Sequence, residues 1–139
     1  MKRNERVTHI MTSDVDTVHT GMKLSEVRVM LAERPYHHVP VVSGKRLIGI
    51  ISATDMVRLS LGLYGTDQRA VDAMLDANHS IEDVMTPAPK TMRVTQTVRD
   101  TAEMLSDGAF HAVPVVDDEG NLEGIVTSTD VIRYLLEQY

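Results

Sequence analysis

Hydroxyl and carboxyl side chains recur at one spacing in two places along the chain. Residues 52–55 read Ser-Ala-Thr-Asp and residues 127–130 read Thr-Ser-Thr-Asp, and each segment ends an apolar run that begins with glycine. If each segment ends a strand and starts a helix, backbone N–H groups and the positive end of the helix dipole can bind a phosphate there. The candidate contact residues are Ser52, Thr54, Asp55, Thr127, Thr129 and Asp130.

The aspartate of each segment adds a second kind of contact. A carboxylate can accept hydrogen bonds from both hydroxyls of a ribose, and the threonine before it adds a donor near the expected phosphate position. A purely structural interpretation also fits. Ser52-x-x-Asp55 and Thr127-x-x-Asp130 have nearly the form of a capping box, which bonds the free N–H groups of a helix start. A capping box prefers Glu or Gln at its fourth position, and it requires no threonine before the acid. Both roles stay open, and they can coexist at different atoms.

Two further pairs precede the predicted strands at equivalent positions. Tyr36 and Phe110 could stack on an adenine, although core aromatics that close the end of a helix are the simpler interpretation. His37 and His111 could sense phosphate charge near neutral pH, or they could simply form a hydrogen bond at a strand edge.

Arg58 and Arg133 lie three residues after the two aspartates. This spacing places each arginine on the helix face of its aspartate, and a surface ion pair is the simplest expectation. An arginine that points toward a bound ligand would instead supply a cation for the phosphates of ATP.

The candidate residues belong to a duplicated segment. Pro40 and Pro114 are 74 residues apart, whereas Asp55 and Asp130 are 75 apart because the intervening turn is one residue longer in the second copy. We expect repeat 1 at 5–61, a connector at 62–79 that starts with a glycine-bounded break at 62–65, and repeat 2 at 80–139.

Each repeat predicts the order strand, helix, strand, strand, helix. Apolar residues at three- and four-residue spacing predict the first helix of each copy, and two β-rich runs around a glycine turn predict a hairpin of buried strands. The expected elements are an extended segment near 15–18, helices at 24–31 and 98–105, strands at 39–42 and 47–51, second helices at 55–61 and 130–136, and an extra helix at 67–78.

Composition narrows the function classes. The chain has 139 residues, 42% of them hydrophobic, and a formal net charge of −6, which disfavours a nucleic-acid partner because such binding needs clustered Lys and Arg. It has no cysteine and no long apolar stretch, so we expect a cytoplasmic protein without disulfides, secretory signal or membrane span. Recognisable catalytic motifs and histidine pairs at metal-ligand spacing are absent from the sequence, so we expect neither an enzyme nor a metal site.

Both repeats resemble cystathionine β-synthase (CBS) domains, and the chain resembles a stand-alone tandem pair, or Bateman module. Supporting motifs are Met-Thr at 11–12 and 85–86, the Val-Pro-Val-Val strands, and Gly-h-h-Ser/Thr-x-x-Asp in both copies, where h is an apolar residue. The resemblance implies an α+β fold in which two β-α-β-β-α units pack sheet to sheet with pseudo-twofold symmetry, leaving two clefts between them. It also implies that the Ser/Thr and Asp contact phosphate and ribose, and that backbone near Thr12, Thr17, Thr86 and Thr91 holds the base.

The resulting hypothesis is a regulatory sensor. It would bind AMP, ADP, ATP or S-adenosylmethionine as a regulatory ligand, with no catalytic cofactor, and pass a conformational change to an unidentified partner protein. Apolar faces on both second helices predict a homodimer. These faces contain Met56, Val57, Leu59, Val131, Ile132 and Leu135. The alternative is a non-catalytic interaction scaffold with degenerate clefts.

Overall fold

The computed structural model of the chain describes residues 4–61 and 67–139. The predicted glycine-bounded break at 62–65 lies outside these residues. The chain divides into two compact units. We call them the repeat-1 unit, formed by Asp16–Gly44 and Ile48–Ala88, and the repeat-2 unit, formed by Met1–Val15, Lys45–Leu47 and Pro89–Tyr139.

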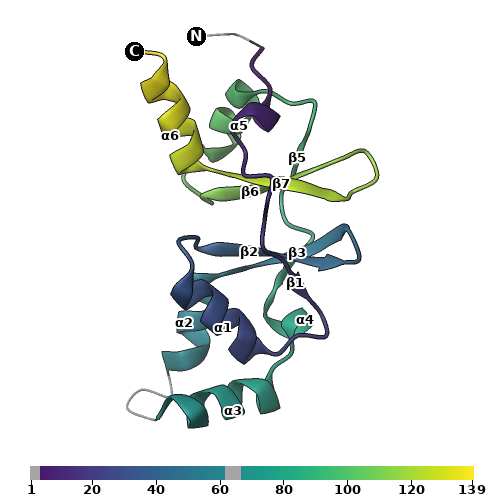
Figure 1. Cartoon of the computed structure of the whole chain (residues 1–139), viewed down its shortest axis with the longest axis vertical. Coiled ribbons are helices and arrows are strands. Elements are labelled where there is room, and N and C mark those ends of the chain that lie inside the picture. The colour runs from purple at the N-terminus through teal and green to yellow at the C-terminus, as the bar shows by residue number, and fades with distance from the viewer. Residues whose placement is uncertain (1–3, 62–66) are drawn as a thin grey trace. The chain divides into compact units, whose positions relative to one another are not determined.

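The repeat-1 unit contains a four-stranded sheet with the order β1-β2-β3-β4. Strand β1 runs parallel to β2, and β3 runs antiparallel to β4. Helices α1 and α2 lie together on one face of the sheet (Figure 1). The elements are β1 (Val18–His19), α1 (Leu24–Glu33), β2 (His38–Ser43), β3 (Arg46–Ser52), α2 (Ala53–Ser60), α3 (Gln68–Asn78), α4 (Ile81–Val84) and β4 (Thr86–Pro87).

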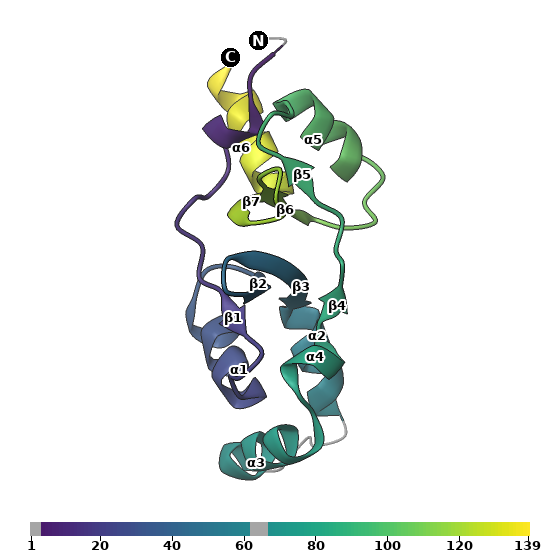
Figure 2. The same cartoon turned by 90° about the vertical axis from the view of Figure 1, so that its right-hand side faces the viewer.

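The repeat-2 unit contains a three-stranded sheet with the order β5-β6-β7, in which β5 is parallel to β6 and β6 is antiparallel to β7. Helices α5 and α6 lie on one face of this sheet (Figure 2). The elements are the 3-10 helix η1 (Val7–His9), β5 (Met92–Arg93), α5 (Val98–Leu105), β6 (Ala112–Val116), β7 (Leu122–Thr127) and α6 (Ser128–Glu137). Both units therefore confirm an α+β fold with the predicted order β-α-β-β-α.

The predicted strand near 15–18 is displaced. Strand β1 is Val18–His19, because pairing begins where Val18 lies opposite Val41 of β2. The predicted burial of the central strands is confirmed for β6, all of whose residues are buried, and for Val39 to Val42 of β2. Strand β3 is less buried, with only Gly49 and Ile51 fully covered.

The first residues of each repeat pack into the unit named after the other repeat. Val7, at the start of repeat 1, is fully buried in the core of the repeat-2 unit, and Ile81, at the start of repeat 2, is fully buried in the core of the repeat-1 unit. Thr12 bonds both ways with Ile125 of β7, and Thr86 pairs with Ile50 of β3. Each packed unit therefore combines most of one repeat with the first residues of the other.

Glycine makes both of these close approaches possible. A Cβ atom at Gly124 would lie 2.7 Å from Sδ of Met11, and one at Gly49 would lie 2.9 Å from Cγ of Met85. Real Cβ contacts are essentially never that short, so a larger residue would displace the methionine. The glycine of each Gly-h-h-Ser/Thr-x-x-Asp segment thus has a packing role, next to the methionine of the Met-Thr pair.

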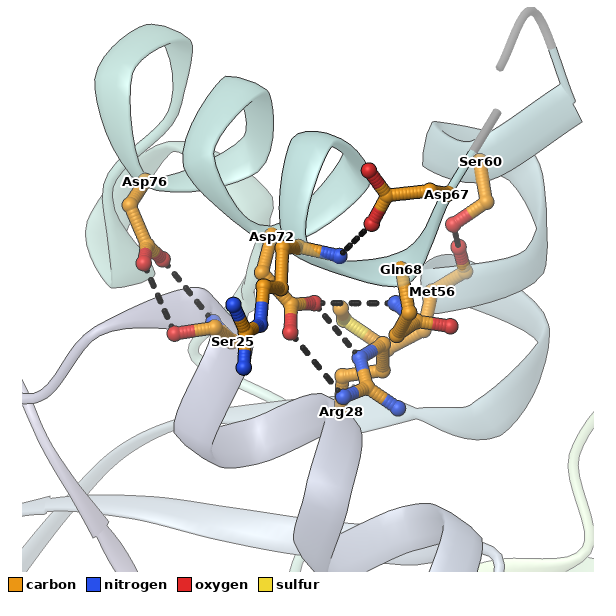
Figure 3. Close-up of polar contacts among 9 residues, drawn as sticks. Ser25, Arg28, Met56, Ser60, Asp67, Gln68, Asp72 and Asp76 are labelled. Carbon is orange, nitrogen blue, oxygen red and sulfur yellow. Dashed lines mark hydrogen bonds and ion pairs between the residues drawn. The ribbon is translucent and has the colours of Figure 1, made fainter.

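Helix α3 docks on α1 (Figure 3). Val71 and Leu75 of α3 enter the core of the repeat-1 unit. On the polar side, Arg28 donates to both carboxylate oxygens of Asp72, at 2.7 and 3.1 Å. The hydroxyl of Ser25 donates to Asp76 at 2.7 Å, so α3 is held by apolar and ionic contacts together.

Candidate functional site

The segment Ser52–Asp55 joins β3 directly to α2. Ser52 is the N-cap of the helix, with an extended backbone (φ −107°, ψ 161°), and its hydroxyl accepts a bond from the Asp55 N–H at 3.1 Å. The Ser52 N–H donates to Asp55 Oδ2 at 2.8 Å. The capping interpretation is therefore realised. Among the described residues Asp55 Oδ1 has no partner, so that oxygen and the exposed Thr54 stay available for other contacts.

The second segment repeats this arrangement between β7 and α6. The Thr127 N–H donates to Asp130 Oδ2 at 2.8 Å, and the Asp130 N–H donates to the Thr127 hydroxyl at 3.2 Å. The Thr127 hydroxyl also lies 3.1 Å from Asp130 Oδ2. Thr129, like Thr54, is exposed. Both segments therefore present one aspartate, one exposed threonine and a helix start, as the sequence predicts.

Aspartate at the fourth position is less specific for a ligand than the sequence argument assumes. Helix α4 starts with the same reciprocal box between Ser80 and Asp83, and α5 starts with one between Thr97 and Asp100. Among the described residues, aspartate thus fills the fourth position of a capping box at four helices, so its presence in place of Glu carries no preference for a ligand. What distinguishes the two candidate segments is the threonine immediately before the aspartate.

The residues before β2 and β6 lie next to these helix starts. The His37 carbonyl accepts a bond from the Ala53 N–H at 2.8 Å, and the His111 carbonyl accepts one from the Ser128 N–H at 3.0 Å. Both histidine side chains are exposed. Tyr36 is half-buried against the core of its unit, as Phe110 is in the other unit, which agrees with the core-aromatic interpretation.

Tyr36 also makes a contact that the sequence analysis did not anticipate. Its hydroxyl donates to Asp16 Oδ2 at 3.0 Å. Partial burial, followed by the hydrogen bond to Asp16 and the charge of Asp16, raises the pKa of Tyr36 to about 12. The phenol is therefore a neutral donor at physiological pH. The 74-residue offset could have identified this position, since Asp16 corresponds to Lys90 just as Tyr36 corresponds to Phe110.

The four threonines near the first strands are divided differently from the sequence repeats. Thr17 and Thr86 belong to the repeat-1 unit, and Thr12 and Thr91 belong to the repeat-2 unit. Each unit therefore combines one threonine from its own repeat with one from the first residues of the other repeat. The sequence offset identifies equivalent threonines but gives no information on which unit each one joins.

The predicted ion pairs on the second helices are wrong. Neither Asp55 with Arg58 nor Asp130 with Arg133 forms an ion pair in the described part of the chain. The reason is that both aspartates turn back to the N–H group of their own cap residue. Both arginines are exposed.

The described residues contain neither a metal-binding group of side chains nor a membrane-spanning helix. No three His, Asp or Glu side chains within 4–61 and 67–139 come together in a group able to hold a metal ion. In the same ranges, every helix is too short or too polar to cross a membrane.

Known protein families and solved structures contain domains similar to these two units. The CBS domain model matches residues 7–62 and 81–137. The solved structure of CBSX2 from Arabidopsis thaliana in complex with AMP has a TM-score of 0.81 and 26% identity, covering 96% of this chain and 98% of that one. The CBS pair of MJ0100, solved with 5′-methylthioadenosine and S-adenosyl-L-methionine, has a TM-score of 0.77 and 27% identity, covering 96% and 98%.

Relatives in sequence are longer. MJ0188 of Methanocaldococcus jannaschii, an uncharacterised protein, is 34% identical over 136 residues, which are 96% of this chain and 45% of that protein. The chain thus spans about half the length of the first curated relatives it matches. Two matches of the CBS domain model, the twice-repeated β-α-β-β-α order and the similarity to solved CBS pairs lead to one conclusion: this chain belongs to the CBS domain family and contains a pair of these domains.

Proposed function

We propose that this chain is a regulatory module that binds adenosine-containing ligands at the starts of α2 and α6. The observation that carries the proposal is the double occurrence of a capped helix start with an exposed threonine and an aspartate oxygen that is left for a ligand. Solved relatives that contain AMP, 5′-methylthioadenosine or S-adenosyl-L-methionine support the same ligand class. Binding would be read by a partner protein in the cytoplasm, without catalysis by this chain.

Each proposed contact uses atoms that the capping boxes leave available. Asp55 and Asp130 would accept from ribose hydroxyls through Oδ1, while Oδ2 continues to cap the helix. Thr54 and Thr129 would donate to a phosphate or another polar 5′ group. Backbone of the neighbouring threonines would hold the base, with Thr17 and Thr86 in one unit, and Thr12 and Thr91 in the other. Tyr36, Phe110, His37, His111, Arg58 and Arg133 remain candidates for secondary contacts.

Isothermal titration with AMP, ATP, S-adenosylmethionine and NAD tests the proposal. We expect saturable binding of at least one of them, and we expect Asp55→Ala and Asp130→Ala each to remove one binding event. Because each substitution also removes a cap, worth about 1 kcal/mol, Asp100→Ala is the matched control. It breaks the same kind of box at α5 and should leave binding unchanged.

The alternative function is an interaction scaffold with degenerate clefts. One observation favours it: the hydroxyls of Ser52 and Thr127 and one oxygen of each aspartate are already engaged within the chain. Absence of saturable binding of all four ligands would support the scaffold. Unchanged stoichiometry and affinity in both Asp→Ala variants would contradict the assigned ribose contacts.

We also propose that the module is a homodimer, although its apolar surface is smaller than the sequence indicates. Met56, Leu59 and Val131 pack into the cores of their own units, so they offer no free face. The residues that do stay exposed are Val57 at 59%, Ile132 at 57% and Leu135 at 41%. In the repeat-1 unit Val57 lines an apolar groove between α1 and α2, together with Leu31, Ala32, Ala53, Met56 and Leu61. A monomeric mass in light scattering at micromolar concentration would contradict the dimer.

A further inference from the structure

The two proposed sites differ at one charged position. Asp16 and Lys90 occupy equivalent places, since each lies two residues before the first strand of its repeat. The strand registers agree, with Val18 opposite Val41 and Met92 opposite Val115, a separation of 23 residues in both units. The sequence offset and the backbone pairing thus independently make Asp16 and Lys90 counterparts of opposite charge.

Two hydrogen bonds on the adjacent residues Tyr36 and His37 connect Asp16 to the start of α2. Asp16 accepts from the Tyr36 hydroxyl at 3.0 Å, and the next residue, His37, accepts through its carbonyl from the first N–H of α2 at 2.8 Å. The carboxylate of Asp16 is therefore fixed by the residue next to the one that bonds the first N–H of α2, and Asp55 lies in the first turn of that helix.

The repeat-2 unit keeps the backbone link but not the carboxylate. His111 accepts from the first N–H of α6 at 3.0 Å, as His37 does at α2. Phe110 has no hydroxyl to fix a neighbour, and the Lys90 ammonium makes no hydrogen bond or ion pair with any described residue. The repeat-2 unit thus has the unpaired cation Lys90 where the repeat-1 unit has the fixed anion Asp16. The histidine before the second strand and the arginine on the second helix are present in both units.

We propose that the two sites select adenosine ligands by the charge of the 5′ substituent. The repeat-2 unit takes the ligand with an anionic 5′ phosphate, and the repeat-1 unit prefers one whose 5′ group is neutral or cationic, such as a thioether or a sulfonium. Lys90 and Asp16 are the specificity-determining residues. This inference rests on the proposed function, because it presumes that an adenosine ligand binds at each helix start.

The discrimination should be moderate and sensitive to salt. Asp16 and Lys90 are exposed, and charge pairs near water contribute about a two- to fivefold change in affinity. The Debye length is about 8 Å at physiological ionic strength, so raising the salt concentration should reduce the effect.

Titration of AMP and 5′-methylthioadenosine into single-site variants tests the inference. These probes share adenosine and differ in the charge at the 5′ position. In the Asp55→Ala background, only the repeat-2 site remains, and Lys90→Gln should weaken AMP about two- to fivefold while changing 5′-methylthioadenosine less than twofold. In the Asp130→Ala background, Asp16→Asn should strengthen AMP by a similar factor and again leave the neutral probe unchanged.

Matched controls remove equal charge elsewhere. Arg99→Gln on α5 and Asp67→Asn, where asparagine can still cap α3, should leave the AMP to 5′-methylthioadenosine affinity ratio unchanged. If both probes bind but Lys90→Gln and Asp16→Asn leave this ratio at its starting value, the charge selection is wrong while the proposed function stands. If neither probe binds the unmodified chain, the proposed function itself fails, and the selection fails with it.

Discussion

Helices α1 and α5 occupy the same place in the two repeats but are stabilised by different means. Helix α5 is capped locally, with the Thr97 hydroxyl accepting from the Asp100 N–H at 3.1 Å. Helix α1 has Lys23 at its N-cap, without a hydroxyl or carboxyl to accept such a bond, and it is instead held from outside by α3. Equivalent positions in a repeat thus predict equivalent backbone structure, but they do not predict which contacts stabilise it.

The first way to test this difference is to remove the apolar contact of α3. Leu75 is 1% exposed in the core of the repeat-1 unit, so Leu75→Ala should cost about 2–5 kcal/mol through lost burial and an unfilled cavity. Native-state hydrogen exchange should show this loss at the amide of Val41, with little change at Val115 of the other unit.

The neighbouring substitution Met74→Ala is the control, since Met74 is 43% exposed on the same helix. It should cost about 0.5 kcal/mol or less. Equal destabilisation by the two substitutions would mean that α3 does not pack on α1 through Leu75. A loss of equal size at Val41 and Val115 would mean that the two units unfold together.

The helices and hairpins could be predicted from the sequence because their patterns are local. The apolar spacing of Leu24 and Val27 predicts α1, and Ser52 and Thr127 correctly predict the starts of α2 and α6. The exchange of the segments around Val7 and Ile81 could not be predicted. A duplicated sequence shows which residues are equivalent. It does not show which core each of them enters, because either core could accept the apolar side chain of Val7 or Ile81.

Prediction of the candidate sites was limited by a different cause. The Ser/Thr-x-x-Asp spacing identifies capped helices in general, as α4 and α5 demonstrate, so spacing alone cannot separate a cap from a ligand contact. The contact between Asp16 and Tyr36 joins residues 20 positions apart in two irregular segments, where no periodicity applies. Only comparison of Asp16 with Lys90 across the repeats draws attention to it.

Removing the local cap of α5 should have the next largest effect on stability. Thr97→Ala should cost about 1 kcal/mol, because the Asp100 N–H loses its acceptor. The reciprocal variant Lys23→Thr should stabilise α1 by a smaller amount, since Glu26 already bonds the Lys23 N–H at 2.9 Å and could complete a capping box. Hydrogen exchange within each helix measures both. Destabilisation of α1 by Lys23→Thr would contradict the comparison.

A pair of double-mutant cycles compares the ionic contacts of the two helices. Arg28 and Asp72 form a two-bond pair whose side chains are 24% and 26% exposed, so we expect a coupling energy of about 1 kcal/mol. Arg99 and Glu103 on α5 are 80% and 66% exposed, and their coupling should be about 0.3–0.5 kcal/mol. Equal couplings would show that docking by α3 adds nothing to the ion pair on α1.

The smallest expected difference between the two units is in how their stability depends on acid and salt. The hydrogen bonds from Arg28 hold the pKa of Asp72 below the usual range, and the backbone N–H of Asn121 does the same for Asp117 in the β6–β7 turn. A carboxyl with a depressed folded pKa stabilises the fold above its unfolded pKa, and this contribution is lost as the pH falls through the folded value. Both units should therefore lose stability in acid below about pH 4.

Added salt should change the stability contributions of Asp72 and Asp117 by different amounts. The partner of Asp72 is a charged guanidinium, whereas the partners of Asp117 are neutral amides, so added salt should weaken the Asp72 contribution more. Asp72→Asn should consequently flatten the acid and salt dependence of the repeat-1 unit, whereas Asp117→Asn should flatten only the acid dependence of the repeat-2 unit. Hydrogen exchange at several salt concentrations measures both effects. An equal salt response in the two variants would mean that the charge of Arg28 does not set the stability of the α1–α3 contact.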